Sequence, residues 1–163
     1  MTSSSSAAKD GNELVFVALG GAGVTARELA TLYAGLGDGG EVAPLVWQAA
    51  DEKEPENAYR LFSEDTAARI SSILAGAPSL EGRAPADLTQ KASRVAFKTG
   101  TSYGYRDAWA AGHGGGYTVV VWVGRADSAP RPGSTGRKTA APLLFEVFDM
   151  LDRDGSTEGE IEK

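Results

Sequence analysis

Four consecutive residues in the second half of the chain combine a cation, two hydroxyl groups and a glycine. They are Lys98, Thr99, Gly100 and Thr101, and they follow the apolar segment Val95 to Phe97. The lysine supplies positive potential, the threonines supply hydrogen-bond donors, and the glycine lets another backbone approach closely. At the end of a strand, this combination predicts a surface that binds a carboxylate and handles protons.

A second pattern is typical of nucleotide binding. Gly21-Ala-Gly23-Val-Thr-Ala26 fits the G-x-G-x-x-A sequence that holds the pyrophosphate of NAD or FAD between a strand and a helix. Such a site also needs a second parallel strand that ends in an acidic residue about 20 positions later. Here Pro44 interrupts the candidate strand, and the next acidic residue is Asp51. We therefore interpret the glycines as a turn before an ordinary helix, with a dinucleotide-binding domain as the alternative.

The other residue types that carry out catalysis are scarce. One Ser-x-x-Lys pattern occurs, Ser6-Ala-Ala-Lys9, in a serine-rich leader with no apolar pattern to bury the lysine, and we interpret it as accidental. Cysteine is absent and His113 is the single histidine, which excludes thiol catalysis and a Cys/His zinc site. We expect no metal and no cofactor. Because His113 begins a glycine-rich turn, we expect it to face solvent.

The composition indicates one soluble globular domain. The chain has 163 residues, of which 42% are hydrophobic and 23% charged. A net charge of −6 without a basic block argues against a nucleic-acid partner. The sequence contains no signal-peptide pattern and no apolar run long enough to cross a membrane. We expect a flexible leader at 1–13, one folded domain at 14–151 and an acidic disordered tail at 152–163.

The hydrophobic spacing predicts helices in the first half of the chain. Thr25 and Glu28 have the spacing of a capping box, and the apolar residues that follow predict a helix from Ala26 to Leu36. Ser63 is the expected N-cap of a second helix, which Gly76 and Pro78 end. Three shorter segments have weaker signals: Leu14 to Leu19 as a strand, Val42 to Trp47 as a strand broken by proline, and Ser79 to Ala92 as turns.

The second half of the chain changes to strand periodicity. Strands are predicted at Val95 to Thr101, Ala108 to Gly112 and Tyr117 to Gly124, the last two joined by a hairpin at His113 to Gly116. Apolar residues at helical spacing predict a final helix from Ala141 to Leu151. These elements favour an α+β fold, in which an antiparallel sheet of at least three strands packs against the C-terminal helix.

Two long segments resemble a known family. FKTGTSYGYRDAWAAG at 97–112, followed by YTVVVWVGRADSAPRPGSTGRKTAAPLLFEVFDML at 117–151, resembles the C-terminal half of the transpeptidase domain of class A penicillin-binding proteins. Upstream, ALGG at 18–21 and TARELATLYA at 25–34 are similar to the family's segment before its third active-site motif. The resemblance implies part of the serine β-lactamase and transpeptidase fold.

The resemblance also implies roles for individual residues. In the family a serine attacks a D-Ala-D-Ala peptide or a β-lactam, and the Lys-Thr-Gly strand binds the substrate carboxylate. By position, Lys98 is then the catalytic residue that tunes the proton relay. Thr99, Gly100 and Thr101 bind substrate, and the Thr101 backbone N–H is one donor of the oxyanion hole. Substrate lies along the strand edge. Arg106 and Asp107, close by, either contact substrate or form a structural ion pair.

One motif of the family does not occur in this sequence. No Ser-x-Asn is present, because Asn12 and Asn57 follow Asp10 and Pro55 at that offset. We therefore expect the chain alone to be inactive and to need the N-terminal half of the transpeptidase domain as a partner. The alternative is a non-catalytic interaction or scaffold domain.

Further expectations concern partners and location. The resemblance implies a peptidoglycan stem peptide or β-lactam as ligand of the parent protein, and a periplasmic or cell-envelope location anchored in the bacterial inner membrane. We also expect self-association, because the helical half would otherwise cover the apolar stripe Leu29, Leu32, Tyr33 and Leu36.

Overall fold

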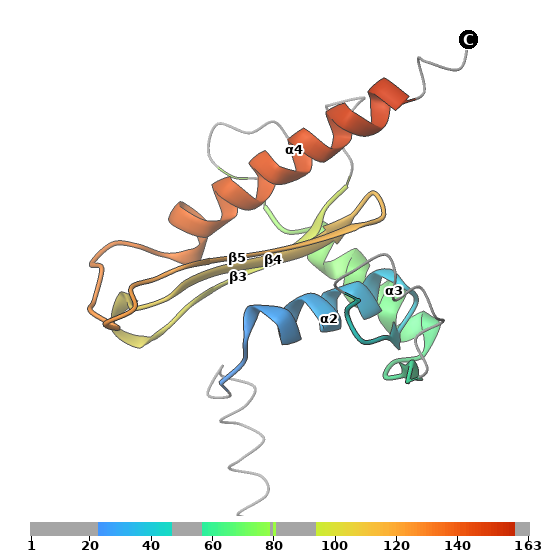
Figure 1. Ribbon diagram of the computed structural model, residues 1–163, viewed down its shortest axis with the longest axis horizontal. Helices are drawn as coiled ribbons and strands as arrows, with labels where there is room; N and C mark the ends of the chain where they lie inside the picture. Colours follow the sequence, from blue (N-terminus) through green and yellow to red (C-terminus); the bar gives the residue numbers. More distant parts are fainter. Residues whose placement is uncertain (1–22, 47–56, 79, 81–93, 159–163) are drawn as a thin grey trace, which may run out of the picture.

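The computed structural model describes residues 23–46, 57–78, 80 and 94–158. A three-stranded antiparallel sheet lies in the middle, with helix α4 on one face and helices α2 and α3 on the other (Figure 1). The α+β class, the antiparallel sheet and the covering C-terminal helix are confirmed. The helices on the second face were not predicted to cover it.

The central sheet has the strand order β3-β4-β5 and consists of β3 (Ala96–Thr101), β4 (Ala108–Gly114) and β5 (Tyr117–Val123). All three predicted strands are confirmed to within one or two residues. The hairpin turn is shorter than predicted, because it contains only Gly115 and Gly116, whose φ angles are 59° and 80°. Left-handed conformations at both turn residues are typical of the tightest hairpins.

The core lies between the sheet and α4 (Ala141–Glu158). Side chains alternate along a strand, so every second residue of β3 turns toward this helix. Phe97 is buried there, and its ring meets that of Phe145 edge to face with 4.9 Å between centroids. The other buried core residues are Val95, Ala108, Ala110, Ala140, Ala141, Leu144 and Phe148. Helix α4 ends at Glu158 rather than at the predicted Leu151.

Helix α2 (Ala26–Gly37) packs against β4 and β5 on the opposite face. Its predicted capping box is confirmed: the Glu28 backbone N–H donates to Thr25 Oγ1 at 3.2 Å, and the Thr25 backbone N–H donates to Glu28 Oε2 at 2.7 Å. The expectation that its apolar stripe is exposed is wrong, because the stripe is half-buried against the sheet. Its members are Leu29, Leu32, Tyr33 and Leu36.

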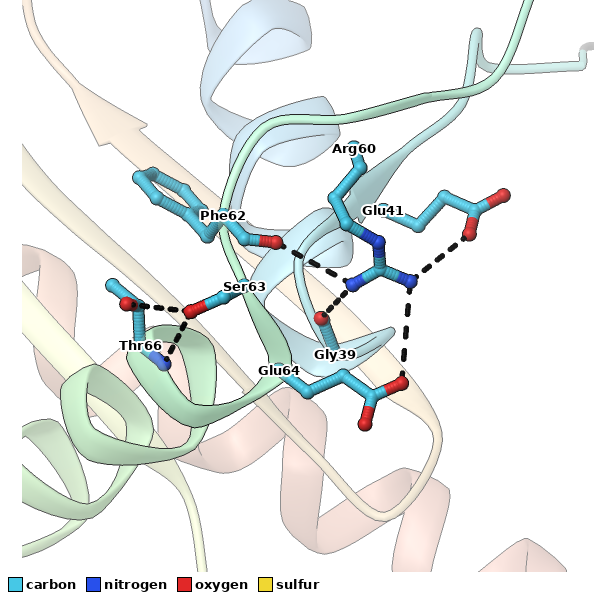
Figure 2. Close-up of polar contacts among 7 residues, drawn as sticks. All are labelled: Gly39, Glu41, Arg60, Phe62, Ser63, Glu64 and Thr66. Atoms are coloured by element: carbon cyan, nitrogen blue, oxygen red, sulfur yellow. Dashed lines mark hydrogen bonds and ion pairs between the residues drawn. The ribbon is translucent and has the colours of Figure 1, made fainter.

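Helix α3 (Glu64–Ala75) packs against β3. As predicted, Ser63 is its N-cap: the backbone N–H of Thr66 donates to Ser63 Oγ at 3.2 Å (Figure 2). The helix ends at Gly76, which is also as predicted.

A small two-stranded sheet joins α2 to α3. It pairs β1 (Glu41–Val42) with β2 (Tyr59–Arg60), so the predicted strand at 42–47 is wrong at residues 43–46, and Trp47 lies outside the described residues. The strand stops two residues before Pro44, which has no N–H for a ladder. Arg60 fastens this sheet: its guanidinium donates to the Gly39 carbonyl at 2.9 Å and pairs with Glu41 at 3.5 Å and with Glu64 of α3 at 4.0 Å (Figure 2).

Several predictions fall outside the described residues. They are the leader at 1–13, the apolar run at 14–19, Gly21, most of the segment at 79–92, and residues 159–163. Both sheets in the described part of the chain are antiparallel, so this part contains no parallel βαβ unit of the kind that a dinucleotide site needs. Within the same ranges, no helix is long and apolar enough to span a membrane.

Two neighbouring leucines on α4 test how this core is built. Leu144 is fully buried and Leu143 is 44% exposed. We expect Leu144→Ala to lower the free energy of unfolding by about 2–5 kcal/mol, because it leaves a cavity against the sheet. Leu143→Ala is the matched control and should cost less than about 1 kcal/mol. Urea unfolding followed by circular dichroism measures both, and equal losses would contradict this packing.

Candidate functional site

The predicted carboxylate-binding residues lie on an outer strand. In the described sheet β3 has one neighbour, β4, and its other edge is unpaired there. Lys98 is exposed, and its Nζ donates to the Thr99 carbonyl at 2.5 Å. Thr99 is half-buried, while Gly100 and Thr101 are exposed. The structure thus presents the whole motif at one accessible strand edge.

The threonine hydroxyls and the lysine ammonium project from opposite faces of β3. Because Phe97 is in the core under α4, Thr99 and Thr101 share its side of the sheet, and Lys98 lies on the side of α2 and α3. Thr101 Oγ1 accepts a hydrogen bond of 3.0 Å from the Gly136 backbone N–H. A hydroxyl that accepts one such bond still has its own hydrogen to donate. Thr101 is therefore an oriented donor.

Gly136 holds the end of β3 in place, a role that the sequence did not indicate. It begins the π-helical turn η4 (Gly136–Ala140) and is buried. A methyl group on this residue would collide with the carbonyl oxygens of Gly100 and Trp109. Only glycine lets the turn lie this close to β3 and β4. In the sequence, this residue could not be distinguished from the other glycines of its Pro/Gly loop.

The two further candidates, Arg106 and Asp107, lie on the loop after β3 and have different roles. The carboxylate of Asp107 accepts a hydrogen bond of 3.0 Å from the indole of Trp122, and the Asp107 backbone N–H donates to Ser102 Oγ at 2.8 Å. Asp107 thus holds the loop to β5 rather than forming the ion pair with Arg106 that the sequence suggested. Arg106 is exposed on the same loop and stays a candidate substrate contact.

Trp109 and Trp122 lie next to Gly100 in a row that runs across the three strands of the sheet. Gly100 pairs with Trp109 and Trp109 pairs with Trp122 in the register of the sheet. The two rings lie 6.2 Å apart between centroids, tilted by 45°, and Trp122 is 45% exposed. Because Gly100 has no side chain, nothing on β3 covers Trp109 along this row. These rings lie on the same face of the sheet as the Lys98 side chain.

The prediction for His113 is wrong. It is a half-buried strand residue paired with Ala96, not a solvent-facing turn residue. Its Nε2 lies 3.1 Å from Ser71 Oγ of α3, and its ring lies against Gly37 at the end of α2. Burial lowers the pKa of His113, and the nearby Asp38 carboxylate opposes this shift. The histidine therefore joins both helices to the sheet, a role that only the tertiary structure reveals.

The chemistry available at this edge is anion binding by donors. A lysine ammonium and two threonine hydroxyls all donate hydrogen bonds. In the described ranges, no group of three or more His, Cys, Asp or Glu side chains could hold a metal ion. The site's described residues can bind and polarise a ligand.

Comparison with known proteins gives one clear relationship. The chain is 36% identical over 133 residues, or 82% of its length, to Penicillin-binding protein 1C of Escherichia coli (strain K12). It spans 16% of the length of that protein. No family model matches the chain.

The close approach of Gly136 to β3 leads to a first prediction for the site. We expect Gly136→Ala to lower the free energy of unfolding by about 1–3 kcal/mol, because the added methyl forces the turn away from the strand. Gly23→Ala is the control, since its added methyl meets nothing within 4 Å. Urea midpoints measure both changes. A Gly136→Ala protein as stable as the Gly23→Ala protein would argue against the contact.

The buried His113 predicts a dependence of stability on pH. Its pKa in the folded chain is lower than the ordinary value of 6.5, so the unfolded chain binds the proton first as pH falls. Stability is full above about pH 6.5 and declines below it. His113→Gln should remove this part of the pH dependence. Thermal unfolding of both proteins between pH 7.5 and 5 provides the test, and parallel profiles would show that His113 is not responsible.

Proposed function

The chain is related to the penicillin-binding proteins, and from this relationship we propose that it carries the Lys-Thr-Gly wall of a peptidoglycan D,D-transpeptidase site. In this proposal the chain corresponds to the C-terminal half of a class A transpeptidase domain. Its ligand is the carboxylate of a peptide ending in D-Ala-D-Ala, or that of a β-lactam. The reaction is acyl transfer, with a serine supplied by a separate polypeptide segment.

One observation supports this proposal most directly: Lys98, Thr99 and Thr101 occupy an exposed strand edge with a glycine between the threonines. In an acidic chain of net charge −6, a strand edge that has an exposed ammonium on one face and two hydroxyl donors on the other favours a carboxylate bound along the edge itself. The edge itself offers backbone groups to an extended peptide, which adds to the sheet as another strand. Gly100 leaves room for that peptide backbone.

Each residue of the motif has a distinct task in this proposal. Lys98 supplies positive potential and lowers the cost of proton transfer by the incoming serine and its relay. Thr99 and Thr101 donate to the carboxylate, and the Thr101 backbone N–H stabilises the oxyanion of the tetrahedral intermediate. The hydrogen bond from Gly136 keeps the Thr101 hydroxyl in place without using its hydrogen.

The chain alone is inactive in this proposal. A nucleophilic serine needs a base within hydrogen-bond reach, and the sequence contains no Ser-x-Asn relay. The helical part that brings the serine and the relay is then the first partner of the chain, in the cell envelope where peptidoglycan is made. A non-catalytic scaffold role is the alternative outcome of the experiment below.

Covalent labelling with a fluorescent penicillin tests the proposal. We expect no labelled band on a denaturing gel from the chain alone. Mixing it with a separately produced helical part that carries Ser-x-x-Lys and Ser-x-Asn should restore the band. In that mixture Lys98→Ala should slow labelling about 10- to 150-fold, since a hydrogen bond to a charged group contributes about 1.5–3 kcal/mol.

Two controls make the result specific. Lys138→Ala removes another exposed lysine and should leave the labelling rate unchanged. A band from the chain alone that disappears in Ser6→Ala would contradict the proposal and identify Ser6 as a nucleophile. Labelling that stays absent in a folded mixture would favour the scaffold role.

A further inference from the structure

Tyr103 has the most exposed side chain among the large hydrophobic residues of the described chain. It is 97% exposed, against 45% for Tyr105 and 47% for Tyr117. A single exposed apolar side chain is common on proteins and needs no explanation by itself. An aromatic ring with its whole surface open on a backbone that is held in place is different, because such rings dominate the energetics of binding surfaces.

The loop that carries Tyr103 is closed at its base. The Ser102 backbone N–H donates to the Asp107 carbonyl at 3.0 Å, and the Asp107 backbone N–H donates back to Ser102 Oγ at 2.8 Å. The Tyr105 backbone N–H donates to the Ser102 carbonyl at 3.1 Å. The indole of Trp122 then anchors the loop to β5 through the Asp107 carboxylate. The short 3₁₀ turn η3 (Tyr103–Tyr105) is thus fixed to the sheet at both ends.

The backbone of this turn is also strained. Gly104 has a φ of 75° and Tyr105 a φ of 57°. A left-handed conformation is easy for glycine and unfavourable for tyrosine. The Arg131 backbone N–H donates to the Tyr105 carbonyl at 2.9 Å and helps to hold the turn in this conformation. Strain that the surroundings maintain is concentrated at functional sites.

The position of the turn connects it to the proposed carboxylate site. Tyr103 is two residues after Thr101, the last residue of β3, so the two Cα atoms are at most about 7 Å apart. A ligand whose carboxylate is bound at Thr99 and Thr101 therefore has its last residue beside this turn. A tyrosine side chain is long enough to reach that residue.

We propose that Tyr103 is a specificity-determining residue, whose ring packs against the side chain of the ligand residue that carries the bound carboxylate. This inference rests on the proposed function. The ligand class is a peptide with a C-terminal D-residue that has a small apolar side chain. The rigid mounting suits this task, because a tyrosine on a fixed backbone loses little conformational freedom when it binds.

The inference predicts discrimination between two terminal residues. A methyl group packed against a ring contributes about a fourfold difference in affinity. The full chain should therefore bind N-acetyl-L-Lys-D-Ala-D-Ala about four times more tightly than N-acetyl-L-Lys-D-Ala-Gly. Tyr103→Ala should bring this ratio close to one, and Tyr103→Phe should preserve it. Tyr117→Ala is the matched control, because Tyr117 is an exposed tyrosine at the opposite end of the sheet.

Titration of the ¹⁵N-labelled chain with each peptide, followed by NMR, tests the proposed function and the role of Tyr103 separately. Shifts of the Thr99 to Thr101 amides report the proposed function, and the affinity ratio reports the role of Tyr103. Amide shifts with a ratio near four in both the wild type and Tyr103→Ala would overturn this inference alone, as would a wild-type ratio near one. Absence of amide shifts with either peptide would overturn the proposed function and this inference together. A ratio lost in Tyr103→Ala and retained in Tyr117→Ala supports it.

Discussion

The packing of Phe97 against Phe145 sets the geometry of the site. One ring from β3 and one from α4 meet 4.9 Å apart in the core, and this contact decides which face of β3 is inside. Since side chains alternate along a strand, a shift of one residue in register would exchange the faces of Lys98 and Thr99. The motif can present its donors only because an apolar residue immediately before it is committed to the core.

A second constraint acts on the backbone rather than on side chains. Gly136 brings the turn before α4 against the carbonyl groups of Gly100 and Trp109, and its N–H binds Thr101 Oγ1. The turn that leads directly into the helix burying Phe97 therefore also orients the last residue of the motif. This arrangement explains why the end of β3 and the loop after it are fixed in space, although they are exposed. The packing of α4 and its preceding turn on the sheet thus determines both the core and the geometry of the site.

Local signals were sufficient for much of the fold. The capping box at Thr25, the N-cap at Ser63 and the alternation in 117–123 each act within a few residues, so the sequence predicts their elements to within about two residues. The resemblance to penicillin-binding proteins, which the similarity to Penicillin-binding protein 1C supports for the chain as a whole, suggested roles for the residues of β3 that stay predictions. Tertiary contacts decided the rest.

His113 shows why those contacts escaped prediction. Its neighbours in sequence are glycines, which indicate a turn, yet the turn begins two residues later and the ring is half-buried between α2 and α3. The helices bury the second face of the sheet because their apolar stripes need a partner, and no local pattern states which surface that is. Gly136 was overlooked for a similar reason: a glycine that permits close approach has the same sequence signal as one that permits a turn.

An exposed lysine on an outer strand also has a simpler explanation, since charges on such strands prevent unwanted pairing with other chains. Lys98 fits that role, and the proposed carboxylate site is compatible with it, because a bound carboxylate would neutralise the same ammonium that keeps other strands away. Protection of the edge, however, gives no reason for Gly100, which removes a side chain from the row that leads to Trp109 and opens the backbone to approach. It gives no reason either for fixing the Thr101 hydroxyl. Under the proposed function, an edge that is charged at one residue and open at the next admits one kind of strand, a strand that carries its own negative charge.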